Sequence, residues 1–250
     1  MIISLLAFVV VFSVVVLVHE YGHFVLARRS GVKVYEFSIG FPFSPRLCTL
    51  FRNKETEFTL RLLPLGGFVS FSKEGDDDAK ELFGASLPNR ALIMSAGSLF
   101  NIAFAFMIFI PVFMFGRHLH FIDALLTSAN TLWAILSGTV IFLWNIVTGH
   151  GGMEGLSGPV GIAAMAGKAA GKGFLSLLYF TGVLSMSLGI MNLFPLPALD
   201  GGQLLMLLIE AVRKKPIGIK TYQAVNLVGF ALFIALSLLV TYRDIVKLAA

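Results

Sequence analysis

Residues 2–24 read IISLLAFVVVFSVVVLVHEYGHF, and this stretch decides the fold. Apart from two serines, the run before the first histidine is apolar, and the whole stretch reaches the roughly 20 residues that a helix needs to cross the hydrocarbon layer of a membrane. His19, Glu20 and His23 follow at the end of the apolar run. Because an ionisable side chain at membrane depth costs about 2.5 to 3.5 kcal/mol, three of them together require a compensating partner, and we expect a metal ion.

His19 and His23 are four residues apart and therefore project from one face of a helix, one turn above the other. Two neutral imidazoles in that arrangement can bind one Zn2+ ion, while the carboxylate of Glu20 lies beside them and can accept a proton from an attacking water without being a ligand. H-E-x-x-H also occurs by chance in soluble helices, but here it ends an apolar span, where ionisable residues usually have a function. The motif therefore predicts a catalytic metal site at membrane depth.

The composition places the whole chain among polytopic α-helical membrane proteins. Of its 250 residues, 57% are hydrophobic and only 13% are charged, and the mean hydropathy is +0.87. The one cysteine, Cys48, excludes an internal disulfide. We treat residues 1–250 as a single integral-membrane domain.

The distribution of positive charge predicts the orientation in the membrane. The formal net charge is +5, and residues 24–90 and 201–221 together hold fourteen of the nineteen Lys and Arg residues. Loops rich in Lys and Arg stay on the cytoplasmic side, so we expect both termini outside and the His/Glu cluster near the cytoplasmic face. The same loops also carry many acidic residues, which excludes a uniformly basic surface for nucleic acid.

Hydropathy predicts about four membrane-spanning helices, at residues 2–24, 91–115, 174–196 and 222–241. A further apolar segment, residues 121–148, is long enough to span but contains several polar residues and two tryptophans.

The parity of the crossings decides how segment 121–148 is interpreted. If it crossed, the next span would carry Asp200, the third metal ligand proposed below, to the outer face, about 30 Å from the histidines. We therefore expect an interfacial amphipathic helix that lies on the outer surface. The glycine-rich residues 149–173 that follow predict an outer loop and re-entry segment.

A small membrane-associated β-hairpin or sheet is predicted between the first two spans. Residues 32–39 are rich in strand-forming side chains, and residues 56–62 alternate between apolar and polar side chains, which together indicate three or four short strands. The apolar turn that follows contains Gly66 and Gly67, which permit close approach of the backbone to a neighbour.

The third predicted span ends in residues 192–202, which read NLFPLPALDGG. Pro195 and Pro197 must break the helix, and irregular backbone at membrane depth is tolerated only where it is buried in protein or lines a wet cavity. Asp200 offers an oxygen ligand that completes a His2Asp set around zinc, and Asn192 can donate hydrogen bonds to a peptide carbonyl or to a developing oxyanion.

The combination of H-E-Y-G-H with N-x-x-P-x-P-x-x-D-G resembles the site-2 protease family of intramembrane zinc metalloproteases. Residues 156–163, LSGPVGIA, and the turn at residues 64–69 are similar to its RseP-type bacterial branch. The resemblance implies one bound Zn2+ with the ligands His19, His23 and Asp200, the general base Glu20 and the substrate or oxyanion contact Asn192. It also implies a membrane-dipping β-hairpin that pairs with substrate. The predicted substrate-binding residues are Gly66, Gly67, Phe68, Asn192, Pro195 and Pro197.

The resemblance further implies an intramembrane zinc metalloendopeptidase that acts in regulated intramembrane proteolysis. Its partners would be the lipid bilayer and single-span membrane proteins already cleaved by another protease, such as anti-sigma factors or remnant signal peptides, in a bacterial cytoplasmic (inner) membrane, with no nucleic acid involved. Two features depart from the branch: residues 116–120 stand where its members carry PDZ domains, and Ser187 stands where many carry Asn.

A membrane metal transporter or metal sensor is the alternative function, because it would also place His and Asp residues within its spans. Glu20 discriminates between the two, since a transporter would use it as a ligand whereas a protease needs it for chemistry.

Overall fold

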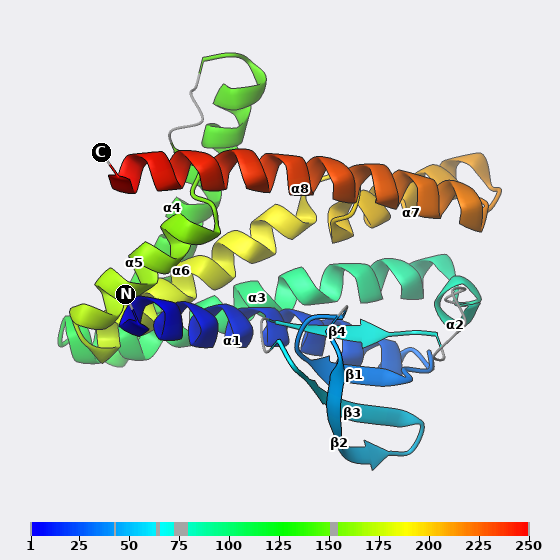
Figure 1. The fold of residues 1–250 in the computed structure, drawn as a ribbon, viewed down its shortest axis with the longest axis horizontal. Helices are drawn as coiled ribbons and strands as arrows, with labels where there is room; N and C mark the ends of the chain where they lie inside the picture. Colours follow the sequence, from blue (N-terminus) through cyan, green and yellow to red (C-terminus); the bar gives the residue numbers. More distant parts are fainter. Residues whose placement is uncertain (1, 43, 64–65, 73–79, 151–154, 250) are drawn as a thin grey trace.

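The computed structural model describes residues 2–42, 44–63, 66–72, 80–150 and 155–249 (Figure 1). Pro64 and Leu65, which belong to the predicted apolar turn, lie outside the described residues. The elements in chain order are α1 (Ile2–Arg29), β1 (Glu36–Ile39), β2 (Arg46–Asn53), β3 (Thr56–Arg61), β4 (Gly67–Ser70), α2 (Lys80–Phe83), α3 (Leu87–Gly116), α4 (Phe121–Val147), α5 (Pro159–Gly171), α6 (Phe174–Leu193), α7 (Asp200–Arg213) and α8 (Ile219–Ala249).

The helices confirm a polytopic helical membrane protein. Within the described residues, the five helices α1, α3, α4, α6 and α8 are long and apolar enough to cross a membrane. In Figure 1, α1, α3 and α8 run along the long axis of the molecule, and both chain termini lie at the same end of it. Helix α4, at that end, is steeply inclined to these three helices. The placement of α4 along the outer surface stays a prediction, since α4 is itself long and apolar enough to cross a membrane.

Several helices extend beyond the predicted spans, because hydropathy detects only the apolar part of a helix. Helix α6 instead ends before its predicted limit, at Leu193, two residues ahead of Pro195. The segment predicted as an outer loop and re-entry contains helix α5, which begins with Pro159 in the first helical position, where the missing N–H of proline costs nothing.

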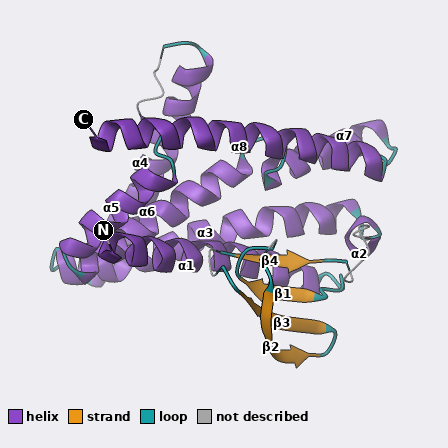
Figure 2. Ribbon diagram, in the orientation of Figure 1, coloured by secondary structure: helices purple, strands orange, loops and turns teal. Residues whose placement is uncertain are grey.

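The predicted small sheet is confirmed as four strands in the order β2-β3-β1-β4 beside α1 (Figure 2). Strand β1 pairs parallel with β3 and antiparallel with β4, which leaves β4 at the edge. Phe37 and Phe58 pack edge-to-face against Phe24 of α1 at ring-centroid distances of 5.4 and 5.6 Å, so aromatic packing fixes the sheet to the helix.

Strand β4 approaches α1 closely because it begins with Gly67 and is preceded by Gly66. A Cβ at Gly67 would lie 2.7 Å from the carbonyl oxygen of Ser38 and 2.9 Å from Leu17 of α1. Gly66 has a φ of +93°, which side chains other than glycine rarely adopt, and faces Val16. The edge strand therefore lies against the turns of α1 just before His19.

Helix α8 is mostly exposed and contacts the bundle at separate places. Near its start, Tyr222 packs edge-to-face on Phe83. Farther along, α8 packs so closely on Pro197 at Gly229 that a larger side chain would clash there. Near its end, buried Asp244 accepts 2.8 Å hydrogen bonds from the backbone N–H groups of Gly158 and Gly161 at the start of α5. A few specific contacts thus hold α8 in place.

Candidate metal centre

The two histidines of α1 present their imidazoles on one side of the helix, toward α3 and α7. His19 and His23 are both buried, and their Nε2 atoms lie 3.2 Å apart. The four-residue spacing places one ring a turn above the other, as the sequence predicts.

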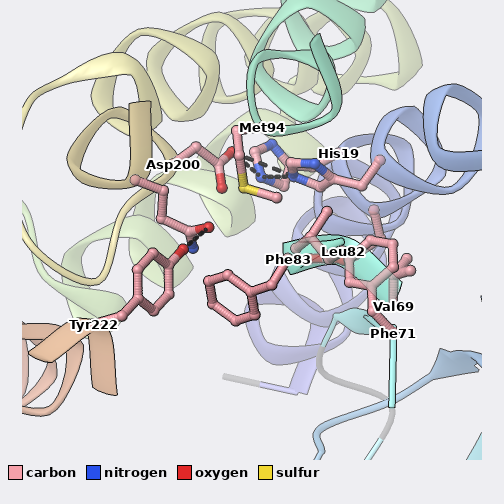
Figure 3. Close-up of a pocket in the computed structure, with 11 residues that line it drawn as sticks. His19, Val69, Phe71, Leu82, Phe83, Met94, Asp200 and Tyr222 are labelled. Carbon is pink, nitrogen blue, oxygen red and sulfur yellow. Dashed lines mark hydrogen bonds and ion pairs between the residues drawn. The ribbon is translucent and has the colours of Figure 1, made fainter. Parts of the chain in front are cut away.

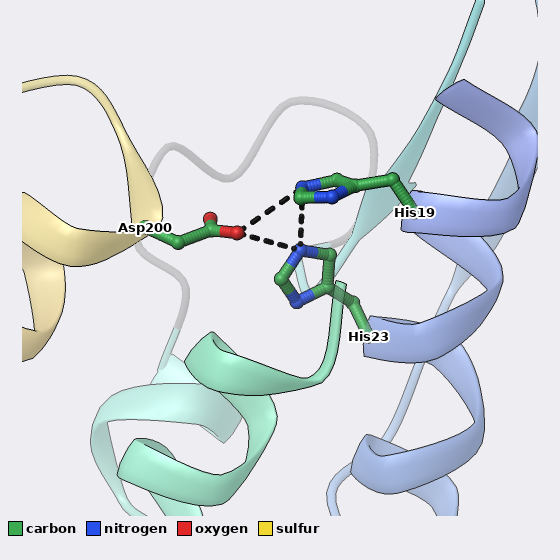
Figure 4. A group of neighbouring side chains, drawn as sticks. All are labelled: His19, His23 and Asp200. Atoms are coloured by element: carbon green, nitrogen blue, oxygen red, sulfur yellow. Dashed lines mark hydrogen bonds and ion pairs between the residues drawn. The ribbon is translucent and has the colours of Figure 1, made fainter. Parts of the chain in front are cut away.

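Asp200 reaches the histidines from the first turn of α7 (Figure 4). Its Oδ2 lies 3.1 Å from Nε2 of His19 and 3.3 Å from Nε2 of His23. The chain between α6 and α7 turns sharply, with Ala198 at a φ of +71°, and a Cβ at Gly201 would overlap the carbonyls of residues 193 and 194. The prolines and glycines of this segment therefore allow the turn that brings Asp200 to the two histidines.

The hydrogen bond of His23 to α3 indicates that its Nε2 atom is free to bind a cation. Its Nδ1 lies 2.8 Å from the carbonyl oxygen of Ile93 in α3, and since a carbonyl only accepts, Nδ1 carries the proton. The Nε2 atom of His23 therefore has a free lone pair. It faces the carboxylate oxygen of Asp200, another acceptor, at a distance that requires a shared cation or proton.

The geometry fits a zinc ion. Four ligands at about 2.0 to 2.1 Å in a tetrahedron lie about 3.3 to 3.4 Å from one another, and the three observed separations are 3.1 to 3.3 Å. Two imidazole nitrogens and one carboxylate oxygen form a donor set typical of catalytic zinc, with a fourth position left for water or substrate.

Gly97 of α3 leaves the space beside the imidazoles open. A Cβ at this position would lie 2.6 Å from Cε1 and 2.7 Å from Nε2 of His19. Only glycine lets the backbone of α3 come this close to the metal ligands.

Glu20 lies next to the two histidines without joining their cluster. It lines the same cavity, and its carboxylate accepts a hydrogen bond from the backbone N–H of Val69 in β4. The side chain is thus held between the metal ligands and the edge strand, where it can act on a water molecule or on substrate.

These side chains surround a cavity of about 310 Å³ (Figure 3). The described residues that line it are His19, Glu20, His23, Val69, Phe71, Leu82, Phe83, Met94, Asp200, Gln203 and Tyr222. Polar groups cluster at the metal ligands and at the pair Gln203 and Tyr222, while the remaining wall is apolar. Such a mixture suits an apolar peptide whose backbone must be bound by a few hydrogen bonds.

The chain matches the sequence model of Peptidase family M50 over residues 7–236. The chain belongs to this family. It is 31% identical to a putative zinc metalloprotease of Clostridium perfringens, over 94% of this chain and 96% of that protein. It is 24% identical to the zinc metalloprotease RasP of Shouchella clausii, over 98% and 99% of the two chains. Part of it is 50% identical to the RasP of Geobacillus kaustophilus, over 42% of this chain and 25% of that protein.

Membership of family M50 confirms the resemblance to site-2 proteases. The chain is therefore a multi-pass membrane zinc metalloendopeptidase with Zn2+ as its cofactor, which favours the protease over the transporter or sensor alternative.

The predicted substrate contacts are brought together only in part. Gly67 lies on β4 beside Glu20, but the described cavity lining includes Val69 of β4 and none of the three predicted residues Gly66, Gly67 and Phe68. The other three predicted contacts, Asn192, Pro195 and Pro197, are not among the described lining residues.

Two polar lining residues were not predicted. Gln203 follows Asp200 by three residues on α7, so helical spacing alone could have drawn attention to it. Tyr222 lies on α8, and nothing local in its sequence indicates that it reaches the cavity.

Proposed function

We propose that His19, His23 and Asp200 hold the zinc ion and that Glu20 is the general base of an intramembrane endopeptidase. The observation that carries this proposal is the meeting of three potential metal-ligand atoms within 3.1 to 3.3 Å of one another, beside Glu20, at the end of an apolar helix. When bound there, Zn2+ supplies Lewis-acid activation of water and of the scissile carbonyl. Glu20 takes the proton of the attacking water and delivers it to the leaving amine.

The edge strand β4 supports the proposed binding of substrate as an added strand. Gly40 donates a 2.9 Å hydrogen bond to Gly66, its partner in the β1–β4 register. Because hydrogen-bonded and non-bonded pairs alternate in an antiparallel ladder, the backbone groups of Gly67 and Val69 point away from β1. The N–H of Val69 is already bonded to Glu20, so a substrate segment that pairs with the backbone of Gly67 and the carbonyl of Val69 lies directly beside Glu20.

Asn192 remains a proposed substrate contact on the α6 side of the site. Its Nδ2 donates a 3.1 Å hydrogen bond to the carbonyl of Leu188 one turn earlier, so it would have to leave this acceptor to reach a peptide. Pro195 and Pro197 precede Asp200 in the same turn and would contact a substrate segment that extends beyond the described cavity lining.

The substrates proposed are single-span membrane proteins that another protease has already cleaved on the outer side, such as anti-sigma factors or remnant signal peptides. Removal of the outer domain frees the remaining helix to unwind, and its backbone amides become available to β4. In this proposal the protein lies in a bacterial inner membrane with both termini outside and the metal site near the cytoplasmic face, as the Lys and Arg distribution predicts.

The test compares protein termini in membrane fractions of cells that express the wild type, Glu20→Gln, or the control Glu55→Gln, whose side chain is 57% exposed in the turn between β2 and β3. We expect new termini inside apolar segments with the wild type and the control, and none with Glu20→Gln, while all three proteins bind one zinc per chain. Identical termini in all three, with equal zinc content, would refute the proposed role of Glu20.

A further inference from the structure

Gln203 lies on the same side of α7 as Asp200, one turn further on, and lines the cavity. Its Oε1 accepts a 2.6 Å hydrogen bond from the hydroxyl of Tyr222 at the start of α8. Gln203 therefore links α7 to α8 beside the metal ligands.

A chain of hydrogen bonds fixes the direction in which the Gln203 amide points. The side chain of Asn226, one turn after Tyr222 on α8, hydrogen-bonds to the Tyr222 hydroxyl. A hydroxyl that accepts from an amide is left to donate onward, here to Oε1 of Gln203. The Tyr222 ring is in turn held by its edge-to-face contact with Phe83, at 5.0 Å between centroids.

The carbonyl end of the amide is thus occupied, and the Nε2 end carries two N–H donors. No acceptor for this nitrogen is present among the described residues. A cavity-lining donor with no protein acceptor can serve a ligand, and at this site the ligand would be a peptide.

Figure 3 shows Tyr222 on one side of the cavity, Val69 of β4 and the following Phe71 on the other side, and Asp200 and His19 between them. An extended peptide paired with β4 turns every second carbonyl toward the opposite wall. Gln203 lies on that wall, because it lines the cavity and its Oε1 is bonded to Tyr222.

We propose that Gln203 is a substrate-binding residue. Its side-chain N–H donates to a backbone carbonyl of the substrate strand, on the edge of that strand that faces away from β4. Tyr222 and Asn226 position the Gln203 side chain. This inference rests on the proposed function, because it requires an extended peptide on β4. Together β4 and Gln203 hold both edges of the same strand. Because both contact only backbone, they accept many side chains and demand only that the segment be extended.

The experiment measures binding and cleavage separately, with the purified, zinc-loaded full chain in detergent. The binding probe is a peptidyl hydroxamate, and the cleavage probe is an apolar peptide that spans a site identified by the mapping of termini. The variants are Gln203→Glu, which keeps the acceptor for Tyr222 but loses the donors, Gln203→Leu, Tyr222→Phe, and the control Gln223→Glu at an exposed glutamine of α8.

We expect Gln203→Glu to bind the hydroxamate about tenfold more weakly and to lose at least as much in kcat/KM, with unchanged zinc content, while Gln223→Glu matches the wild type. Tyr222→Phe should weaken binding about threefold in the wild type and not at all in the Gln203→Leu background, because Tyr222 acts only through Gln203.

Wild-type affinity in Gln203→Glu and Gln203→Leu would overturn the inference. So would an effect of Tyr222→Phe that persists in the Gln203→Leu background, which would show a structural role. Failure of the proposed function has a different signature: the wild type cleaves no better than Glu20→Gln, whatever the result for Gln203.

Discussion

The replacement of Gly97 by alanine tests the metal centre through a residue that is not a ligand. The new Cβ would lie 2.6 to 2.7 Å from two atoms of the His19 ring, whereas carbon atoms in contact normally lie about 3.5 to 4.0 Å apart. Either the ring or α3 must therefore move by close to 1 Å, while zinc–ligand distances tolerate only about 0.2 Å.

The expected loss of zinc affinity is at least about 100-fold, or about 2.7 kcal/mol, because even indirect disturbance of a ligand costs 10- to 100-fold. Competition with a chromogenic chelator, applied to the purified protein, measures this affinity directly. Activity should fall in parallel at limiting zinc.

Gly138→Ala is the matched control, since Gly138 is also a glycine inside a long helix, α4, but a Cβ there meets nothing within 4 Å. It should bind zinc normally and gain about 0.5 to 1 kcal/mol of helix stability. If Gly97→Ala kept wild-type zinc affinity, the placement of α3 against the ligands would be wrong.

Two further predictions concern buried carboxylates that hold helices together. The buried carboxylate of Glu210 lies 2.8 Å from the guanidinium of Arg90. Arg90→Met removes this cation and should lower the unfolding free energy in detergent by about 3 to 5 kcal/mol, most of which the double variant Arg90→Met/Glu210→Leu should recover. Equal losses in the single and the double variant would contradict this prediction. Asp244→Leu deprives the N–H groups of Gly158 and Gly161 of their acceptor and should lower the unfolding free energy by about 2 to 4 kcal/mol. Helix α8 should become sensitive to protease before the other helices. An unchanged unfolding midpoint would refute the role of Asp244.

The sequence predicted best what depends on local spacing and hydropathy. The long apolar helices follow from runs of apolar residues, and the four-residue spacing of His19 and His23 fixes both rings on one side of α1. The approach of Asp200 was also predictable, because a proline-broken helix end with a carboxylate makes sense at membrane depth only if it lines a site.

What the sequence did not predict depends on contacts between distant elements. Helix α5 contains many glycines, and the residue that satisfies its first N–H groups, Asp244, lies more than eighty positions away. Tyr222 lines the cavity only because of the way in which α8 packs beside α7, which no local sequence pattern indicates. The motif likewise did not predict that the Asn192 amide donates to the carbonyl of Leu188 in its own helix, and its contact with substrate stays a prediction.

With substrate bound as proposed between β4 and Gln203, one site can act on many membrane segments without cleaving the protein's own helices. In a helix each backbone N–H is bonded to the carbonyl four residues earlier, so a helical segment offers nothing to the edge of β4 or to Gln203. Only a segment that unwinds gains these hydrogen bonds, and the energy of unwinding becomes the main term that discriminates between substrates. Loss of a metal ligand should therefore stop cleavage of every segment. Loss of the Gln203 donor should spare segments rich in glycine or polar residues, which unwind easily, and abolish cleavage of stable apolar helices first.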